Sequence, residues 1–311
     1  MRRRLSYRLA ALTAATLVGG LAVPLAAISA EASPAGGSLA RREVRDRVAT
    51  AAVPAYDEFT GLGDVNLDGT PDLGVVETAP SGGKLWMYPN RGSQYGLGTR
   101  ALVGSNWNSM RELTGFGDAD FNGYPDLLAV EKSTGNLWFY PGRGGVLYAP
   151  RQLVGSGGWQ GMSMLTNMGP IGGTNGAWTG LAAVETSTGK LWLYRFNGVG
   201  FQSRVLIGNS GWSAMSAVFG VGDLNHDGWN DLAAVEAATG KLWLYPGQGS
   251  GVLGTRIQIG NGGWTGLRSL EGPGDMDSDG NPDVIGIDKN TNIWWLYPGT
   301  AAGTLGTRRQ L

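Results

Sequence analysis

The chain has 311 residues, of which 54 are Gly, 12 are Trp, one is His and none is Cys. The absence of Cys excludes disulfides, thiol nucleophiles and Cys-based zinc sites, and a net charge of −1 lacks the basic footprint of a nucleic-acid-binding domain. Because 42% of the residues are hydrophobic, the Gly excess does not mark a disordered linker. The composition favours many short strands joined by tight turns.

The N-terminal segment 1–32 is predicted to be a secretory signal peptide. Four Arg residues precede an apolar run over 9–27, and Ala30-Glu31-Ala32 offers a small-x-small cleavage site. The alternative is an N-terminal membrane anchor, but the run is interrupted by Pro24 and is short for a bilayer span. We expect 33–50 to be a flexible linker or pro-segment. We also expect a secreted mature protein with no membrane insertion after cleavage.

Residues 51–311 contain five copies of one unit of about 52 residues. A Trp marks each copy: Trp86, Trp138, Trp192, Trp243 and Trp295. A Tyr lies two positions later: Tyr88, Tyr140, Tyr194, Tyr245 and Tyr297. An acid precedes and an Arg follows: Glu77, Glu131, Glu185, Glu236 and Asp288, then Arg100, Arg151, Arg204, Arg256 and Arg308. The copies leave no space for a separate catalytic domain.

Each unit is predicted to be β throughout. In the second copy a Gly-containing turn separates the apolar run 126–131 from the aromatic run 136–140, which predicts a hairpin. A third strand over 151–154 carries the Arg, and a fourth leads into an Asp-rich loop. Four strands in about 52 residues fit a propeller blade. We therefore expect an all-β, five-bladed β-propeller over 51–311, acting as a monomer; an open array or a ring made by two chains are the alternatives.

The repeated charges suggest contacts within and between units. Three of the acids are followed, after the hairpin turn, by a Lys of opposite charge: Glu77 by Lys84, Glu185 by Lys190, and Glu236 by Lys241. This predicts cross-strand ion pairs that close the hairpins; two independently solvated charges are the alternative. The repeated Arg is expected to be an inter-blade or edge-strand charge that discourages strand addition, in preference to a ligand clamp.

Asp-rich loops in four of the five copies are the strongest chemical signal. Oxygen-bearing side chains occupy positions 1, 3, 5 and 9, a turn Gly occupies position 6, and position 7 would offer its backbone carbonyl. Such a loop suits Ca²⁺, which takes about six to eight oxygen ligands; Asx-turns without metal are the alternative. The expected ligands are Asp64, Asn66, Asp68, Thr70, Asp72, Asp118, Asp120, Asn122, Tyr124, Asp126, Asp223, Asn225, Asp227, Trp229, Asp231, Asp275, Asp277, Asp279, Asn281 and Asp283.

We therefore expect about four Ca²⁺ ions and none in the third copy, where the stretch 165–180 is longer and lacks carboxylates. The loops are not EF-hands, because position 12 lacks the Glu that an EF-hand needs. The single His, His226, stands at position 4 of the fourth loop. We expect its side chain to face solvent and to have no catalytic role.

The phrase Gly-x-Gly-Asp-x-Asn-x-Asp-Gly-x-x-Asp-Leu-x-x-Val over 61–76 resembles the FG-GAP/VCBS repeat. That repeat occurs in the integrin α-chain propeller, in some fungal lectin propellers and in many secreted bacterial proteins. The resemblance covers 51–311 and implies a secreted bacterial member, a β-propeller with Ca²⁺ in the blade loops at the ligand positions given above. Well-known members have seven blades, so five is a departure, and the third copy departs by losing its site.

A second Trp series precedes the Asp loops: Trp107, Trp159, Trp212 and Trp264. A Trp beside Gly at a blade junction can stack on a sugar ring; packing between blades is the alternative. The first copy has Val53-Pro54 at the corresponding place.

The sequence thus predicts a secreted calcium-binding propeller that acts as a non-catalytic binding module for carbohydrate or cell-surface polymer. An integrin-like adhesion scaffold for an extracellular protein is the alternative. A hydrolase is least favoured, because nearly all closely spaced carboxylates are committed to metal. We expect no enzymatic activity and no nucleic-acid partner.

Overall fold

In the computed structural model, residues 56–311 are described apart from 79, 81, 93–95, 172–177 and 250. The expected signal peptide (1–32) and linker (33–50) lie outside the described residues, so both stay predictions. Among the described residues, none of the helices has the length and apolar character needed to cross a membrane.

The described strands form five four-stranded antiparallel sheets, each made of four consecutive strands. Blade 1 consists of β1 (Tyr56–Gly63), β2 (Asp72–Glu77), β3 (Lys84–Tyr88) and β4 (Ala101–Ser105). Blade 2 consists of β5 (Met110–Gly117), β6 (Asp126–Glu131), β7 (Leu137–Tyr140) and β8 (Gln152–Gly155). Blade 3 is β9 (Met162–Pro170), β10 (Thr179–Glu185), β11 (Lys190–Phe196), β12 (Val205–Gly208). Blade 4 consists of β13 (Met215–Gly222), β14 (Asp231–Glu236), β15 (Leu242–Tyr245) and β16 (Ile257–Gly260). Blade 5 consists of β17 (Leu267–Gly274), β18 (Asp283–Asp288), β19 (Trp294–Tyr297) and β20 (Arg309–Gln310).

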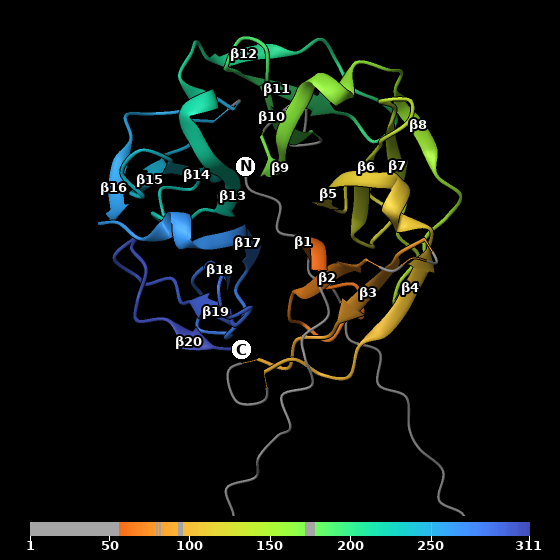
Figure 1. The fold of residues 1–311 in the computed structure, drawn as a ribbon, viewed down its shortest axis with the longest axis horizontal. Coiled ribbons are helices and arrows are strands. Elements are labelled where there is room, and N and C mark those ends of the chain that lie inside the picture. Colours follow the sequence, from red (N-terminus) through yellow and green to blue (C-terminus); the bar gives the residue numbers. More distant parts are fainter. Residues whose placement is uncertain (1–55, 79, 81, 93–95, 172–177, 250) are drawn as a thin grey trace, which may run out of the picture. The chain divides into compact units, whose positions relative to one another are not determined.

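These sheets are the blades of a five-bladed β-propeller, which confirms the predicted fold (Figure 1). The first strand of each blade faces the centre, and each inner strand contacts the inner strands of both neighbours, β1 and β17 included. The ring is therefore closed within one chain. The remaining strands of each blade follow outward in chain order.

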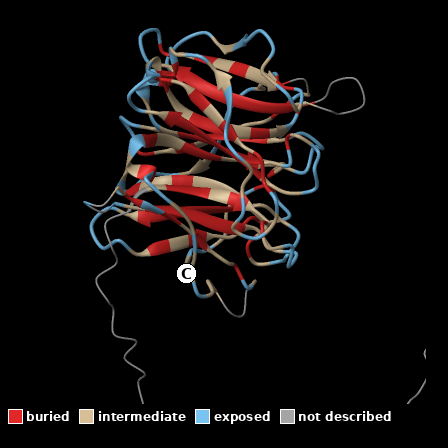
Figure 2. Cartoon of the chain, turned by 90° about the vertical axis from the view of Figure 1, so that its right-hand side faces the viewer, coloured by how far each residue is buried: buried red, intermediate tan, exposed pale blue. Residues whose placement is uncertain are grey.

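The hydrophobic core lies between blades. Five clusters of buried residues each join two neighbouring blades; Phe116, Phe139 and Phe196, for example, meet at the junction of blades 2 and 3. The second strands are buried on both faces because each blade is covered on both sides, as in Asp126–Val130 of β6. Figure 2 shows buried residues along the strands and exposed residues mainly in the connecting turns.

Glycines on the inner strands let the blades approach one another. A Cβ on Gly115 would lie 1.8 Å from the Gly61 carbonyl oxygen, and one on Gly220 would lie 2.0 Å from the Asn167 carbonyl oxygen. The second Gly of each Gly-x-Gly has a left-handed backbone, as at Gly117 with a φ of 62°. These two demands explain why Gly-x-Gly precedes the Asp loops.

Short 3-10 turns carry the second Trp series from one blade to the next: η1 (Trp107–Ser109), η2 (Trp159–Gly161), η4 (Trp212–Ala214) and η5 (Trp264–Gly266). The residue before each Trp is left-handed, with a φ of 80° at Gly158 and 69° at Asn106. Gly and Asn tolerate this conformation best, which accounts for the Gly that precedes three of the four Trp residues.

The seam between blades 5 and 1 is closed by side chains that differ from the repeat pattern. Trp294 replaces the Leu of the other copies, and its ring lies 5.3 Å from Phe59 and 5.5 Å from Tyr88. The Asn90 amide donates a hydrogen bond of 2.8 Å to the Met276 carbonyl. Since both terminal blades are built from consecutive strands, the seam depends on such contacts between blades.

Candidate metal loops and inter-blade pockets

The Asp loops of blades 1, 2, 4 and 5 each have the same pattern of internal hydrogen bonds. In blade 2, the backbone N–H groups of Asn122 and Gly123, at positions 5 and 6, each donate to Asp118 at 2.9 Å. Positions 4 and 6 have left-handed backbones, as at Phe121 (φ 62°) and Gly123 (φ 92°). This turn directs alternate side chains inward. It leaves position 4 outside, where His226 is exposed in blade 4.

The position-9 carboxylate fastens each loop to its blade. One oxygen of Asp126 accepts the N–H groups of Ala119 and Asp120 at 2.8 and 3.2 Å, and the other accepts Gly142 N–H at 2.8 Å. Asp72, Asp231 and Asp283 accept matching bonds and are equally buried. Burial raises the pKa of Asp126 and Asp283 to about 7. Burial also raises the pKa of Asp72 and Asp231 to about 6. A nearby cation would favour the ionised form of each.

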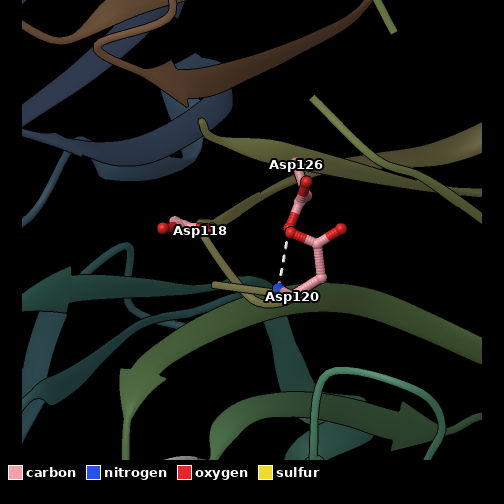
Figure 3. Close-up of side chains that lie close together, drawn as sticks. All are labelled: Asp118, Asp120 and Asp126. Carbon is pink, nitrogen blue, oxygen red and sulfur yellow. Dashed lines mark hydrogen bonds between the residues drawn. The ribbon is translucent and has the colours of Figure 1, made fainter. Parts of the chain in front are cut away.

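Loops 2 and 5 bring three carboxylates together. In loop 2, oxygens of Asp118, Asp120 and Asp126 lie within 4.8 Å of one another, and Figure 3 shows Asp126 directed toward Asp120. Asp275, Asp277 and Asp283 form the same group in loop 5. One buried oxygen of Asp277 has no hydrogen-bond partner among the described residues. Since a buried, unpartnered carboxylate oxygen is costly, these groups fit a hard cation.

Loops 1 and 4 are arranged differently because position 3 is Asn. The Asn66 side-chain NH₂ donates to Asp68 at 2.9 Å, and the Asn225 NH₂ donates to Asp227 at 2.9 Å. The Asn side-chain oxygens instead accept the backbone N–H of position 5. A cation in these loops would require the amide to turn its oxygen inward. The carbonyls at position 7, of Thr70, Tyr124, Trp229 and Asn281, stay predicted ligands.

The third copy has its corresponding loop between β9 and β10, and residues 172–177 lie outside the described part. Its described portion, from Gly169 to Ile171 and at Trp178, contains no carboxylate. The expected absence of a metal there stays a prediction.

The second Trp series packs between blades. Trp107, Trp159, Trp212 and Trp264 are only 6–9% exposed. Each ring stacks on the Tyr of the next blade, with centroids 4.6–5.2 Å apart. A Cβ on Gly155 would lie 2.1 Å from Nε1 of Trp159, and Gly208 and Gly260 face Trp212 and Trp264 in the same way. Inter-blade packing is therefore the main contact that these residues make, and their contact with a ligand stays a prediction.

The repeated acid pairs with Arg where Lys was expected. Glu77 and Lys84 are cross-strand neighbours, as are Glu185 and Lys190. The ion pairs, however, join Glu77 to Arg100, Glu131 to Arg151, Glu185 to Arg204 and Glu236 to Arg256, at 2.9–3.5 Å. The Arg guanidinium covers the indole of the first Trp series at 3.9–4.2 Å in every blade. Lys84 and Lys241 lie over the same indoles in their blades.

Two neighbouring blade junctions, each with a second-series Trp and a Glu–Arg ion pair, contain a pocket. A pocket of about 540 Å³ between blades 1 and 2 is lined by Trp107, Glu131, Tyr140 and Arg151. A pocket of about 280 Å³ between blades 2 and 3 is lined by the equivalent residues Trp159, Glu185, Tyr194 and Arg204. These four residue types supply an aromatic ring, an acceptor, a hydroxyl and a donor. Only the Trp was predicted as a ligand contact.

Charges in these pockets are balanced. Hydrogen bonds from the Thr134 hydroxyl and from Arg151 hold the pKa of Glu131 below its usual value. Thr188 and Arg204 do the same for the pKa of Glu185. Burial raises the pKa of Tyr140, so its hydroxyl stays protonated at neutral pH. Each pocket thus carries one anion and one cation already paired to each other.

Two inner-strand glutamates connect blades near the axis. Glu58 accepts the N–H groups of Glu112 and Leu113 at 3.1 and 2.8 Å, and Glu112 accepts the Leu165 N–H at 3.0 Å. Burial raises the pKa of Glu58 to about 7 and also raises that of Glu112. The sequence gives no signal for these bonds, because the acid occurs at this strand position in two copies only.

Comparison with known proteins finds a partial sequence similarity. No family model matches the chain. Integrin alpha-8 of Gallus gallus is 35% identical over 82 residues, covering 22% of this chain and 8% of that protein, so the match spans a small part of its relative. The Dos1 propeller aligns over 82% of this chain and 60% of its own, with 7% identity and a TM-score of 0.34. BBS1N in complex with ARL6DN aligns over 83% and 71%, with 14% identity and a TM-score of 0.36.

The chain is therefore a five-bladed β-propeller with acidic loops that can hold metal ions. It has a local similarity to an integrin α chain.

Proposed function

We propose that this chain is a secreted, calcium-stabilised propeller that acts as a non-catalytic binding module for carbohydrate or cell-surface polymer. The observation that carries the proposal is the recurrence of one Trp–Tyr–Glu–Arg pocket at neighbouring blade junctions. Concave sites with an aromatic wall and a few fixed polar groups are typical of ligand pockets. Repetition of such sites suits a polymer, because several weak contacts add avidity.

The chemistry of the pockets favours a neutral sugar. Glu131 and Arg151 neutralise each other at 3.1 Å, so a charged ligand gains little net attraction. A sugar hydroxyl can donate to the carboxylate and accept from the guanidinium or from the Tyr140 hydroxyl. The Trp107 ring lies 5.2 Å from Tyr140 with the two ring planes tilted by 38°, and both rings line the pocket.

Calcium in the loops is proposed to act as a structural support. Loops 2 and 5, which carry three converging carboxylates, are the sites we expect to fill first. In loop 5, Arg309 lies 3.1 Å from one oxygen of Asp277, and the other oxygen, which has no hydrogen-bond partner among the described residues, is the one we expect to bind the metal.

An integrin-like adhesion scaffold for an extracellular protein is the second candidate, favoured by the local similarity to integrin alpha-8. A hydrolase is less well supported. Glu58 and Glu112, two carboxylates on neighbouring inner strands, already accept backbone N–H groups.

The proposal is tested with a glycan array and polysaccharide pull-downs on the calcium-loaded protein, followed by a variant with Glu131→Gln and Glu185→Gln. We expect the variant to lose about tenfold or more in apparent affinity, because two of the repeated pockets lose their acceptor charge. The matched control is Glu77→Gln, which breaks the same kind of ion pair at the junction without a second-series Trp. It should bind like the wild type.

Retention of no polysaccharide at high protein concentration contradicts the proposal, as does equal loss of binding in the control. A protein partner that copurifies and is not displaced by free sugar supports the scaffold instead.

A further inference from the structure

A small polar cavity lies on the propeller axis, apart from both the metal loops and the inter-blade pockets. Its volume is about 130 Å³, several times the roughly 10–15 Å³ that a single water needs. Inner strands of all five blades line it, and its polar side chains are Thr60, Thr114, Thr166, Asn167 and Glu271.

Three of these side chains form a partial ring of hydroxyl groups. Thr60, Thr114 and Thr166 occupy the same position on β1, β5 and β9. The Thr60 and Thr166 hydroxyls accept backbone N–H bonds of 2.9 and 2.7 Å from the next blade, and the Thr114 hydroxyl donates to the Leu165 carbonyl at 3.2 Å. These bonds fix the hydroxyls in place. Because a hydroxyl oxygen has two lone pairs, each can still accept one further contact.

Glu271 holds the equivalent position on β17 and brings the only carboxylate among the residues that line the cavity. Within the described part of the chain, its carboxyl group forms no hydrogen bond or ion pair. Glu58 and Glu112 differ, since backbone N–H groups of the following blade occupy them. Glu271 is half-buried, and an unpaired carboxylate partly withdrawn from water is costly unless a proton or a cation compensates it.

We propose that the axial cavity binds one alkali-metal cation, held by the Glu271 carboxylate and by the hydroxyl oxygens of Thr60, Thr114 and Thr166. One carboxylate among neutral oxygens matches a single positive charge. Neutral oxygens replace the hydration shell of K⁺ in other protein sites. Divalent ions fit less well, because Ca²⁺ affinity rises with ligand charge and Mg²⁺ keeps its water.

A proton competes with this cation. Burial, with a further contribution from Glu112, raises the pKa of Glu271 to about 8. The other charged residues on the strands around the axis are Asp57 and Glu58 on β1, Arg111 and Glu112 on β5, and Arg268 on β17; β9 and β13 have none. Arg111 is paired with Glu112 at 3.1 Å. Cation binding is therefore expected to strengthen between pH 6 and pH 9.

The test compares thermal unfolding in KCl or NaCl with unfolding in N-methyl-D-glucamine chloride at equal ionic strength, with Ca²⁺ saturating. At pH 9, and at ten times Kd, the alkali salt should raise Tm by roughly 3–6 °C. The shift should vanish at pH 6 and in Glu271→Gln, and it should persist in Glu77→Gln, which removes a charge far from the axis. As a direct readout, crystals soaked in thallous acetate should show an anomalous peak beside Glu271.

A Tm that does not distinguish the salts at pH 9, or a salt effect that survives in Glu271→Gln, overturns the proposal. So does a Glu271→Gln variant that is more stable at pH 9 in every salt, because Glu271 is then simply held protonated. If the variant fails to fold, the thallium soak of the wild type decides the question, because the absence of an anomalous peak from the axial cavity rejects the site. None of these outcomes depends on whether the pockets bind sugar.

Discussion

Replacing Gly155 by Ala tests whether the second Trp series fixes the distance between blades. An added Cβ would lie 2.1 Å from Nε1 and 2.8 Å from Cε2 of Trp159. The ring cannot yield easily, because Trp159 is 7% exposed and stacks on Tyr194 at 4.7 Å. Overpacking of this kind costs about 1–3 kcal/mol. For a domain of this size that corresponds to a fall in Tm of roughly 2–12 °C.

Gly161→Ala is the matched control, since it makes the same chemical change in the same junction. No atom lies within 4 Å of the Cβ it would add, and its backbone is not left-handed. We expect a change between zero and a gain of about 1 kcal/mol, because Ala restricts the unfolded chain. Urea unfolding in saturating Ca²⁺ measures both variants, and an unchanged m-value shows that the comparison is sound.

The reasoning is checked further in a Trp159→Leu background, where the indole no longer occupies the space above Gly155. There, Gly155→Ala should cost about as little as Gly161→Ala. Equal stability of the two single variants, or a Gly155→Ala cost that persists without the indole, would refute the account of Gly155 as the space for the Trp ring.

Three further predictions concern the loops, the axis and the seam. Chelation by EDTA should lower Tm, because an ion bound only to the folded chain stabilises it; metal analysis should find about one ion fewer in Asp120→Ala, and an unchanged melt would reject the metal assignment. In the folded chain the pKa of Glu58 is raised from 4.5 to about 7. The contribution of Glu58 to the free energy of unfolding is therefore greatest below pH 4.5 and is lost as the pH rises through 7. The unfolding free energy of the wild type relative to Glu58→Gln should therefore decline between pH 5 and 8, and a flat difference would contradict this. Trp294→Leu, which restores the residue of the other copies, should cost about 1–3 kcal/mol by urea unfolding; unchanged stability would mean that the seam is held elsewhere.

The repeat made the fold predictable, because five aligned copies place equivalent residues in equivalent strands. The hairpin predicted from 126–131 and 136–140 corresponds to β6 and β7, which pair in register from Leu127 opposite Tyr140 to Val130 opposite Leu137. The position-9 Asp could be identified as a loop residue by its spacing. Its second role, in holding Gly142 at the end of the third strand, depends on a contact 16 residues away.

The local sequence pattern could not predict that the repeated acid pairs with Arg and not with Lys. Lys84 is the cross-strand neighbour of Glu77, but Arg100 approaches from just before β4, 23 residues later. The central carbon of its guanidinium lies 4.0 Å from the centre of the Trp86 ring, and one of its nitrogens reaches the Glu77 carboxylate at 2.9 Å. A planar guanidinium can contact a ring and a carboxylate at once, whereas an ammonium group is a compact point charge. The preference therefore arises from the indole between the two charges.

Residues that differ from the repeat, and not the shared residues, indicate where the propeller ring closes. Trp294 stands where four copies have Leu, Asn90 where three have Gly, and Glu271 where three have Thr. Trp294 and Asn90 reach across the seam between blades 5 and 1, and Glu271 faces the axis from the last blade. A shared residue must satisfy all five junctions, whereas a residue at a single junction can adapt to the one place where the first and last blades meet. A circular permutation that moves the termini to another junction should therefore leave this seam intact and expose a junction that has no such substitutions.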